Sequence, residues 1–102
     1  MTFNDLTADA KEILDFFSDG WDRDLLFDMA KLAEEVGEVA ECMAKSIKTK
    51  EDLGEELSDV MVVVAIIALK AGIDLNDACR NKQKKRMRKF SGLSARELAL
   101  LR

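Results

Sequence analysis

The sequence contains no histidine, no proline and no tyrosine, and only five glycines. Because proline ends or kinks helices, its absence from a chain rich in Ala, Leu, Glu and Lys predicts an all-α fold. The absence of histidine excludes Ser-His-Asp catalysis and the usual zinc-hydrolase sites. It also argues against di-iron bundles, whose helices carry Glu-x-x-His motifs.

Cysteines and long apolar runs are also scarce. Cys42 and Cys79 lack metal-ligand spacing, so we expect free thiols in a reducing compartment. The longest apolar run, residues 60–69, is too short to span a bilayer, and residues 1–14 show no signal-peptide pattern. These absences predict a cytoplasmic protein that does not contact a membrane.

Length and composition indicate one domain over residues 1–102, with 48% hydrophobic and 35% charged residues. The net charge of −4 is unevenly distributed, because residues 80–89 hold seven basic side chains and no acidic one. Subtracting this +7 leaves −11 for the rest of the chain. An acidic body with a basic helix could hold a metal on one side and phosphate on the other. The alternative is charge complementarity within the fold or across a subunit contact.

Hydrophobic periodicity predicts a bundle of four to five helices. We expect them at residues 3–19, 24–46, 50–71, 74–89 and 95–101, with the motifs in residues 24–90 and a short helical tail in residues 91–102. The expected caps are Thr7 or Asn4, Asp22 or Asp24, Thr49, Asp74 and Ser94 at the N-termini, and Gly20 and Gly72 after the first and third helices.

The two long helices, the second and third, are expected to pack antiparallel. In the second, spacings of 4, 3, 4, 3 and 4 mark a bundle seam made of Leu25, Met29, Leu32, Val36, Val39 and Met43. In the third, residues 60–69 are apolar on every side, and the periodicity from Leu53 to Ala71 favours a helix over a strand. A protomer of this size cannot easily enclose such a segment, so we expect dimerisation to complete the core.

Two pairs of acidic residues at helical spacing are the candidate metal ligands. Residues three apart are neighbours on a helix, so Glu35 with Glu38 can present two carboxylates to one point. Glu56 with Asp59 can do the same on the next helix. One such pair is more often a solvated acidic face, but two facing pairs of like charges indicate a bound cation.

The lack of neutralising partners supports this interpretation. Glu34 and Glu41 have expected partners in Lys31 and Lys45, whereas the four candidate ligands have no evident ones. Asp59 also adjoins the apolar run, where an uncompensated carboxylate is costly. Sites made only of carboxylate oxygens suit Mg²⁺ or Mn²⁺, and Mg²⁺ often binds together with substrate phosphates.

The basic run predicts a phosphate-binding face. Four residues at positions i, i+3, i+4 and i+7 share one side of a helix: Asn81, Lys84, Lys85 and Arg88. Lysine and arginine bind phosphate oxygens. The alternatives are a solvated helix end favoured by the helix dipole, or nucleic-acid binding. The acidic remainder of the chain argues against a nucleic acid polymer as the partner.

Trp21 is the single tryptophan and follows the expected end of the first helix. Packing in the core or in an interface is the usual role of such a residue. The functional alternative is a platform on which a nucleotide base stacks.

The order of these motifs resembles that of a known family. Glu-Glu-Val-Gly-Glu at residues 34–38, seventeen further residues and Glu-Leu-Ser-Asp at residues 56–59 are similar to the E-E-x-x-E … E-x-x-D signature of the MazG-like all-α nucleoside triphosphate pyrophosphohydrolases. The resemblance implies that NTPs or dNTPs are hydrolysed between the α and β phosphates, giving a monophosphate and pyrophosphate. It implies Mg²⁺ held by Glu35, Glu38, Glu56 and Asp59. It also implies a homodimer or a dimer of dimers, and a house-cleaning role in the nucleotide pool.

The acidic residues in and around this cluster also suggest a mechanism. We expect contributions from Glu34 and Glu38, with Glu34, Glu41 or Glu55 orienting or deprotonating the attacking water. Neutralisation of the leaving pyrophosphate is expected from Lys84, Lys85 and Arg88. The alternative is a non-catalytic helical oligomer that binds nucleotides or a partner through residues 80–89.

Overall fold

The computed structural model describes residues 2–17 and 24–102, and the regular structure in these ranges is entirely helical. Five helices follow one another: α1 (Phe3–Asp15), α2 (Leu25–Ala44), α3 (Lys50–Ala71), α4 (Leu75–Ser91) and α5 (Ala95–Leu101). The expected all-α class is therefore confirmed. Within the described ranges, none of the helices is long and apolar enough to cross a membrane.

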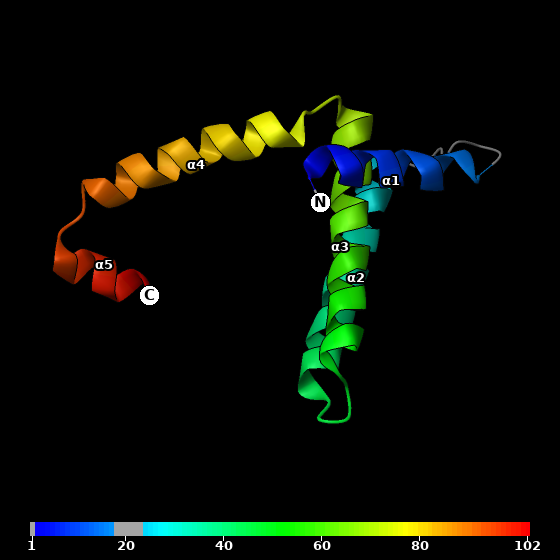
Figure 1. Cartoon of the computed structure of the whole chain (residues 1–102), viewed down its shortest axis with the longest axis horizontal. Helices are drawn as coiled ribbons and strands as arrows, with labels where there is room; N and C mark the ends of the chain where they lie inside the picture. The colour runs from blue at the N-terminus through cyan, green and yellow to red at the C-terminus, as the bar shows by residue number, and fades with distance from the viewer. Residues whose placement is uncertain (1, 18–23) are drawn as a thin grey trace.

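The body of the protein is an antiparallel hairpin of α2 and α3, which pack side by side and are crossed at one end by α1 (Figure 1). Thr49 begins α3 with a capping box, because its side chain accepts from Asp52 N while the Asp52 carboxylate accepts from Thr49 N. Gly72 ends α3 in the left-handed conformation, with φ of 70°. These caps fix where the hairpin turns and where the chain leaves it.

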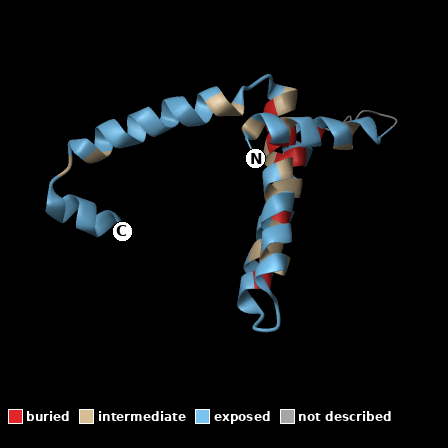
Figure 2. Cartoon of the chain, viewed as in Figure 1, coloured by how far each residue is buried: buried red, intermediate tan, exposed pale blue. Residues whose placement is uncertain are grey.

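A small apolar core lies where α1 crosses α3 (Figure 2). Leu6 and Ala10 of α1 pack against Ala65 and Ile66 of α3, and all four are buried. The apolar run of α3 is not buried on every side in one protomer, since Met61 remains 39% exposed. Dimerisation around this run stays a prediction.

The expected seam of α2 is wrong for the protomer. Four of its six residues are largely exposed: Leu25, Met29, Val36 and Met43. The buried residues of α2 are instead Asp28, Glu35 and Cys42, which recur every seven residues. The hairpin therefore turns a partly polar line of α2 inward and leaves four of the six apolar residues on the surface, while Leu32 and Val39 are half-buried.

α4 forms an arm that leaves the body, and α5 folds back at its far end (Figure 1). At the base of the arm, Leu75 packs on the core and Asn76 Nδ2 donates to Asn4 Oδ1 at 3.1 Å. Beyond this base α4 has no buried residue. The fourth helix is thus an extension of the protomer rather than a packed member of its bundle.

Several predicted helix ends differ from the structure. α1 begins after Thr2, whose capping box with Asp5 replaces the expected caps Thr7 and Asn4. Thr7 lies inside the helix, where its hydroxyl donates to Phe3 O at 2.8 Å. α1 ends at residue 15 rather than 19, α2 ends at residue 44 rather than 46, and α4 continues to residue 91 rather than 89. Asp24 caps α2, whereas Gly20 and Asp22 lie outside the described residues.

Candidate metal centre

The hairpin brings the four predicted carboxylates together. Glu35 and Glu38 come from α2, and Glu56 and Asp59 come from α3. One carboxylate oxygen from each of the four lies within 4.8 Å of the others. Antiparallel packing produces this cluster because each pair is spaced by three residues and so projects from one face of its helix.

Burial differs across the cluster. Glu35 is buried and Glu56 is half-buried, whereas Asp59 is exposed despite its position next to the apolar run. Glu35 Oε2 and Glu56 Oε2 are inaccessible to solvent and have no hydrogen-bond partner among residues 2–17 and 24–102. Buried polar oxygens are nearly always satisfied in proteins, so these two acceptors fit a cation between the helices.

Lys31, the expected partner of Glu34, also contacts Glu35, which the sequence did not lead us to expect. Its Nζ lies 2.9 Å from Glu35 Oε1 and 3.7 Å from Glu34 Oε1. The expectation that Glu35 lacks a local partner is therefore wrong, because Lys31 stands four residues before it on α2. The hydrogen bond to Glu35 raises the pKa of Lys31. Lys31 satisfies only one of the two Glu35 oxygens.

The cluster remains a concentration of negative charge. The charge of Glu35 raises the pKa of Glu38, and loss of solvent and the charge of Glu56 act in the same direction. A divalent cation would offset this repulsion between carboxylates. The donor set holds only carboxylate oxygens, which are ligands for Mg²⁺ and Mn²⁺. The cluster could therefore bind such an ion.

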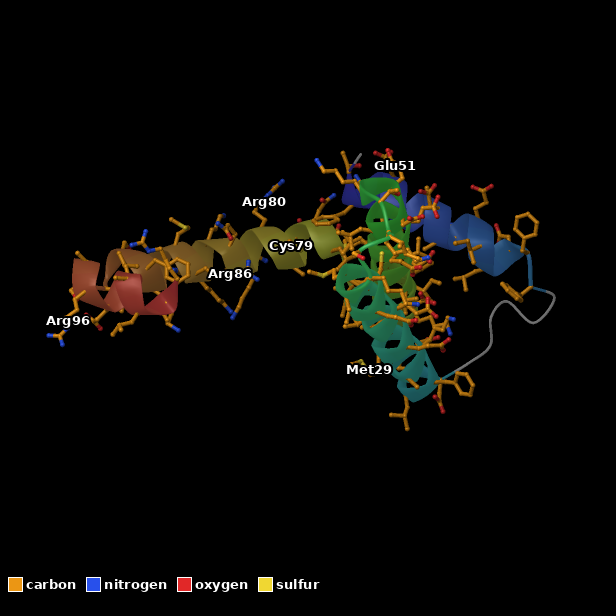
Figure 3. All side chains as sticks on the ribbon, turned by 90° about the horizontal axis from the view of Figure 1, so that it is seen from below. Met29, Glu51, Cys79, Arg80, Arg86 and Arg96 are labelled. Atoms are coloured by element: carbon orange, nitrogen blue, oxygen red, sulfur yellow. The ribbon has the colours of Figure 1, made fainter. Side chains whose placement is uncertain are left out.

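The other predicted site residues lie elsewhere. The basic stripe of Asn81, Lys84, Lys85 and Arg88 is on the α4 arm, which diverges from the hairpin (Figure 1). In Figure 3, Arg80 and Arg86 lie on α4 and Arg96 lies on α5, apart from the α2–α3 hairpin. Within one chain, the structure does not bring the basic stripe to the carboxylates. Trp21 lies outside the described residues.

The candidates for activating water differ in their surroundings. Glu34 has a side chain that is 60% exposed. Glu41 Oε1 lies 2.6 Å from Lys45 Nζ, which confirms that expected ion pair, and the hydrogen bond to Lys45 lowers the pKa of Glu41. Glu55 is exposed on α3. Their catalytic roles stay predictions.

Sequence reasoning also missed the ion pair that joins the open end of the hairpin. Lys70 Nζ of α3 lies 2.9 Å from Asp28 Oδ2 of α2, and Asp28 is only 1% exposed. The separation of 42 positions between the two partners conceals the contact in the sequence. The sequence indicates this contact only through the antiparallel packing of the two helices, which places the start of α2 beside the end of α3.

The fold and the cluster define an all-α protein with a candidate centre for an oxygen-preferring metal ion. Residues 25–91 match the family described as the MazG nucleotide pyrophosphohydrolase domain. This match spans α2, α3 and α4, and the chain belongs to the MazG family. The resemblance noted in the sequence is thus confirmed.

A solved structure supports the same assignment. The chain is similar to the Bacillus-conserved MazG protein, a nucleotide pyrophosphohydrolase, with a TM-score of 0.73 and 29% sequence identity. The similarity covers 83% of this chain and 88% of the other. A comparison with curated proteins finds no match.

Proposed function

We propose that the protein hydrolyses nucleoside triphosphates, or their deoxy forms, between the α and β phosphates. The products are a nucleoside monophosphate and pyrophosphate, and the role is house-cleaning of the nucleotide pool. The proposal is carried by four carboxylates that converge within 4.8 Å, two of them with buried, unpartnered oxygens among the described residues. Membership of the MazG family supports the reaction class.

Mg²⁺ is the proposed metal, with Glu35, Glu38, Glu56 and Asp59 as its ligands. When bound, such an ion lowers the pKa of a coordinated water and neutralises charge on the phosphates. Mn²⁺ can substitute because it accepts the same oxygen ligands. Lys31 holds Glu35 in place through its contact at 2.9 Å, so the unpartnered Oε2 is kept between the helices.

A carboxylate of this chain accepts the proton of the attacking water. The charge of Glu35 raises the pKa of Glu38 when no metal is bound, but a cation on the cluster offsets this repulsion, so the shift does not make Glu38 the base. The lowered pKa of Glu41 makes it a weaker base than an ordinary glutamate. We therefore propose Glu34, whose exposed carboxylate precedes the cluster on α2, as the group that activates the water, and Glu38 as a catalytic residue through its contact with the metal.

The role of the basic stripe on α4 depends on the assembly of the protein. Because α4 diverges from the hairpin, Asn81, Lys84, Lys85 and Arg88 would contact phosphate only from a second copy. A homodimer or dimer of dimers would also cover the exposed apolar residues of α2. We propose this assembly for the active protein.

The reaction is tested by incubating the protein with a panel of NTPs and dNTPs and Mg²⁺, and measuring pyrophosphate and orthophosphate separately. Pyrophosphate and a monophosphate should appear together, and chelation of the metal should abolish both. Orthophosphate as the first product would contradict cleavage between the α and β phosphates. Full turnover by a Glu38→Gln variant would remove Glu38 from the site.

A further inference from the structure

A charged pocket adjoins the carboxylate cluster on the side of the α2–α3 loop. Its volume is about 210 Å³, and it is lined by Glu38, Glu41, Cys42, Lys45, Lys48 and Glu56. Glu38 and Glu56 belong to both the pocket and the cluster. Anything bound on this side of the two carboxylates therefore enters the pocket.

The pocket contains two cationic side chains. Lys45, at the end of α2, forms an ion pair with Glu41 at 2.6 Å. Lys48, in the following loop, makes no ion pair with the part of the chain that the structure describes. Hydrogen bonds from Thr49 lower the pKa of Asp52, and the charge of Lys48 acts in the same direction. The hydrogen bond and the charge of Lys45 lower the pKa of Glu41, and the charge of Lys48 adds to this effect. The pocket thus holds the Lys45 ammonium group, which pairs with Glu41 at the surface, and the Lys48 ammonium group, which forms no such ion pair with the described residues.

The lining indicates which part of a nucleotide fits. All but one of the lining side chains are charged, and the exception, Cys42, is small. A base stacks on an aromatic or aliphatic surface, which this pocket lacks. By contrast, a larger groove of about 510 Å³ is lined mainly by apolar groups that include Phe3, Leu6 and Met61. The lining holds three carboxylates and two ammonium groups, so the pocket can receive phosphate groups when a cation bound to Glu38 and Glu56 offsets their charge.

We propose that Lys48 and Lys45 bind the β and γ phosphates of the substrate and hold the leaving pyrophosphate. This inference rests on the proposed function and adds the orientation in which the triphosphate binds. The triphosphate tail points toward the α2–α3 loop, and the nucleoside lies toward the opposite end of the cluster. On binding, Lys45 exchanges the Glu41 carboxylate for a phosphate oxygen, and Lys48 adds a second charge-assisted contact. The contacts of Lys45 and Lys48 with the β and γ phosphates then come from the same chain that holds the metal ligands.

The test measures pyrophosphate binding directly. Isothermal titration in the presence of Mg²⁺ compares the wild type with Lys48→Gln, Lys45→Gln/Lys48→Gln and Lys48→Arg variants. Two lost charge-assisted contacts at an open site should weaken pyrophosphate binding on the order of tenfold in the double variant. Lys48→Arg should retain most of the affinity. Lys11→Gln, which removes an exposed lysine from α1, is the control and should bind as the wild type does.

Product inhibition distinguishes direct contacts of Lys45 and Lys48 with pyrophosphate from a general effect of their positive charge. In the double variant, the inhibition constant of pyrophosphate should rise on the order of tenfold, while that of the nucleoside monophosphate and the Tm stay unchanged. Unchanged pyrophosphate binding in the double variant would overturn the proposal. So would an equal loss for both products, or a comparable loss in a Lys84→Gln/Arg88→Gln variant with none in the loop variants.

The two proposals can fail separately. If the wild type releases pyrophosphate from a triphosphate and the double variant does so with unchanged kcat/KM, the lysine pocket is refuted and the reaction stands. If the wild type releases no pyrophosphate, but binds it in a manner that depends on Lys45 and Lys48, the reaction is refuted and the pocket stands.

Discussion

Replacing Glu56 by glutamine tests the carboxylate cluster most directly, because it removes charge and keeps the shape of the side chain. In the wild type, Glu35 Oε2 and Glu56 Oε2 are buried acceptors that find no donor among the described residues. The glutamine amide introduces two donors into a cluster whose oxygens lie within 4.8 Å of one another. Without metal, we therefore expect the variant to be more stable than the wild type.

The size of the effect follows from the cost of an unsatisfied buried acceptor, about 1–3 kcal/mol. Because Glu56 is only half-buried, the low end applies, and about 1 kcal/mol corresponds to roughly 4–8 °C in Tm for a domain of this size. Mg²⁺ should reverse the order of stability. An ion at a hundred times its Kd stabilises the folded wild type by about 2.7 kcal/mol, and the variant should lose most of this gain.

Thermal melts in chelator and in increasing Mg²⁺ measure both effects. Glu55→Gln is the matched control, since it removes the same charge one residue away, at an exposed position outside the cluster. This control should keep the Mg²⁺-dependent rise in Tm. A Glu56→Gln protein that melts below the wild type in chelator and still gains the full Mg²⁺-dependent rise would refute a shared metal site.

Three further predictions concern other parts of the molecule. The pKa of Glu38 is raised above 4.5, so its contribution to the unfolding free energy is present below pH 4.5 and is lost as the pH rises through the raised pKa. Urea titrations without metal at a series of pH values should show this loss, and Mg²⁺ should suppress it. Lys70→Met removes the cation that lies 2.9 Å from the buried Asp28 carboxylate, and should lower the unfolding free energy by about 3 kcal/mol in urea titrations; an unchanged value would show that this ion pair does not hold the hairpin. Met29→Glu/Val36→Glu places charge on the exposed apolar line of α2, and should shift the protein to a smaller assembly in light scattering; an unchanged mass would place the interface elsewhere.

Features decided by a few neighbouring residues were predictable from the sequence. The capping boxes that begin at Thr49 and Ser94 formed as expected, because each needs only a hydroxyl and an acidic residue three positions later. The carboxylate cluster was predictable for a related reason. Each pair is local to one helix, and antiparallel packing of two adjacent long helices is the simplest way for them to meet.

Features that depend on the direction of whole helices were not predictable. The basic residues of α4 share a face, but the sequence does not say whether that face meets its own hairpin or another chain. The direction of α4 depends on the few residues between Gly72 and Asn76, including the contact of Asn76 with Asn4 across 72 residues. Lys48, by contrast, lies beside the cluster because its loop joins the two helices that form it.

The error about the seam of α2 connects the site to the assembly. Apolar periodicity identifies the face of a helix that is buried, but not the surface that buries it. In this hairpin the buried side of α2 carries Asp28, which pairs with Lys70 of α3, together with Cys42 and the proposed metal ligand Glu35. The apolar line is thereby displaced to the surface, where Met29 is 54% and Val36 51% exposed. Because the inner face of α2 is partly polar, a single protomer has only a small apolar core. We therefore expect oligomerisation to accompany activity.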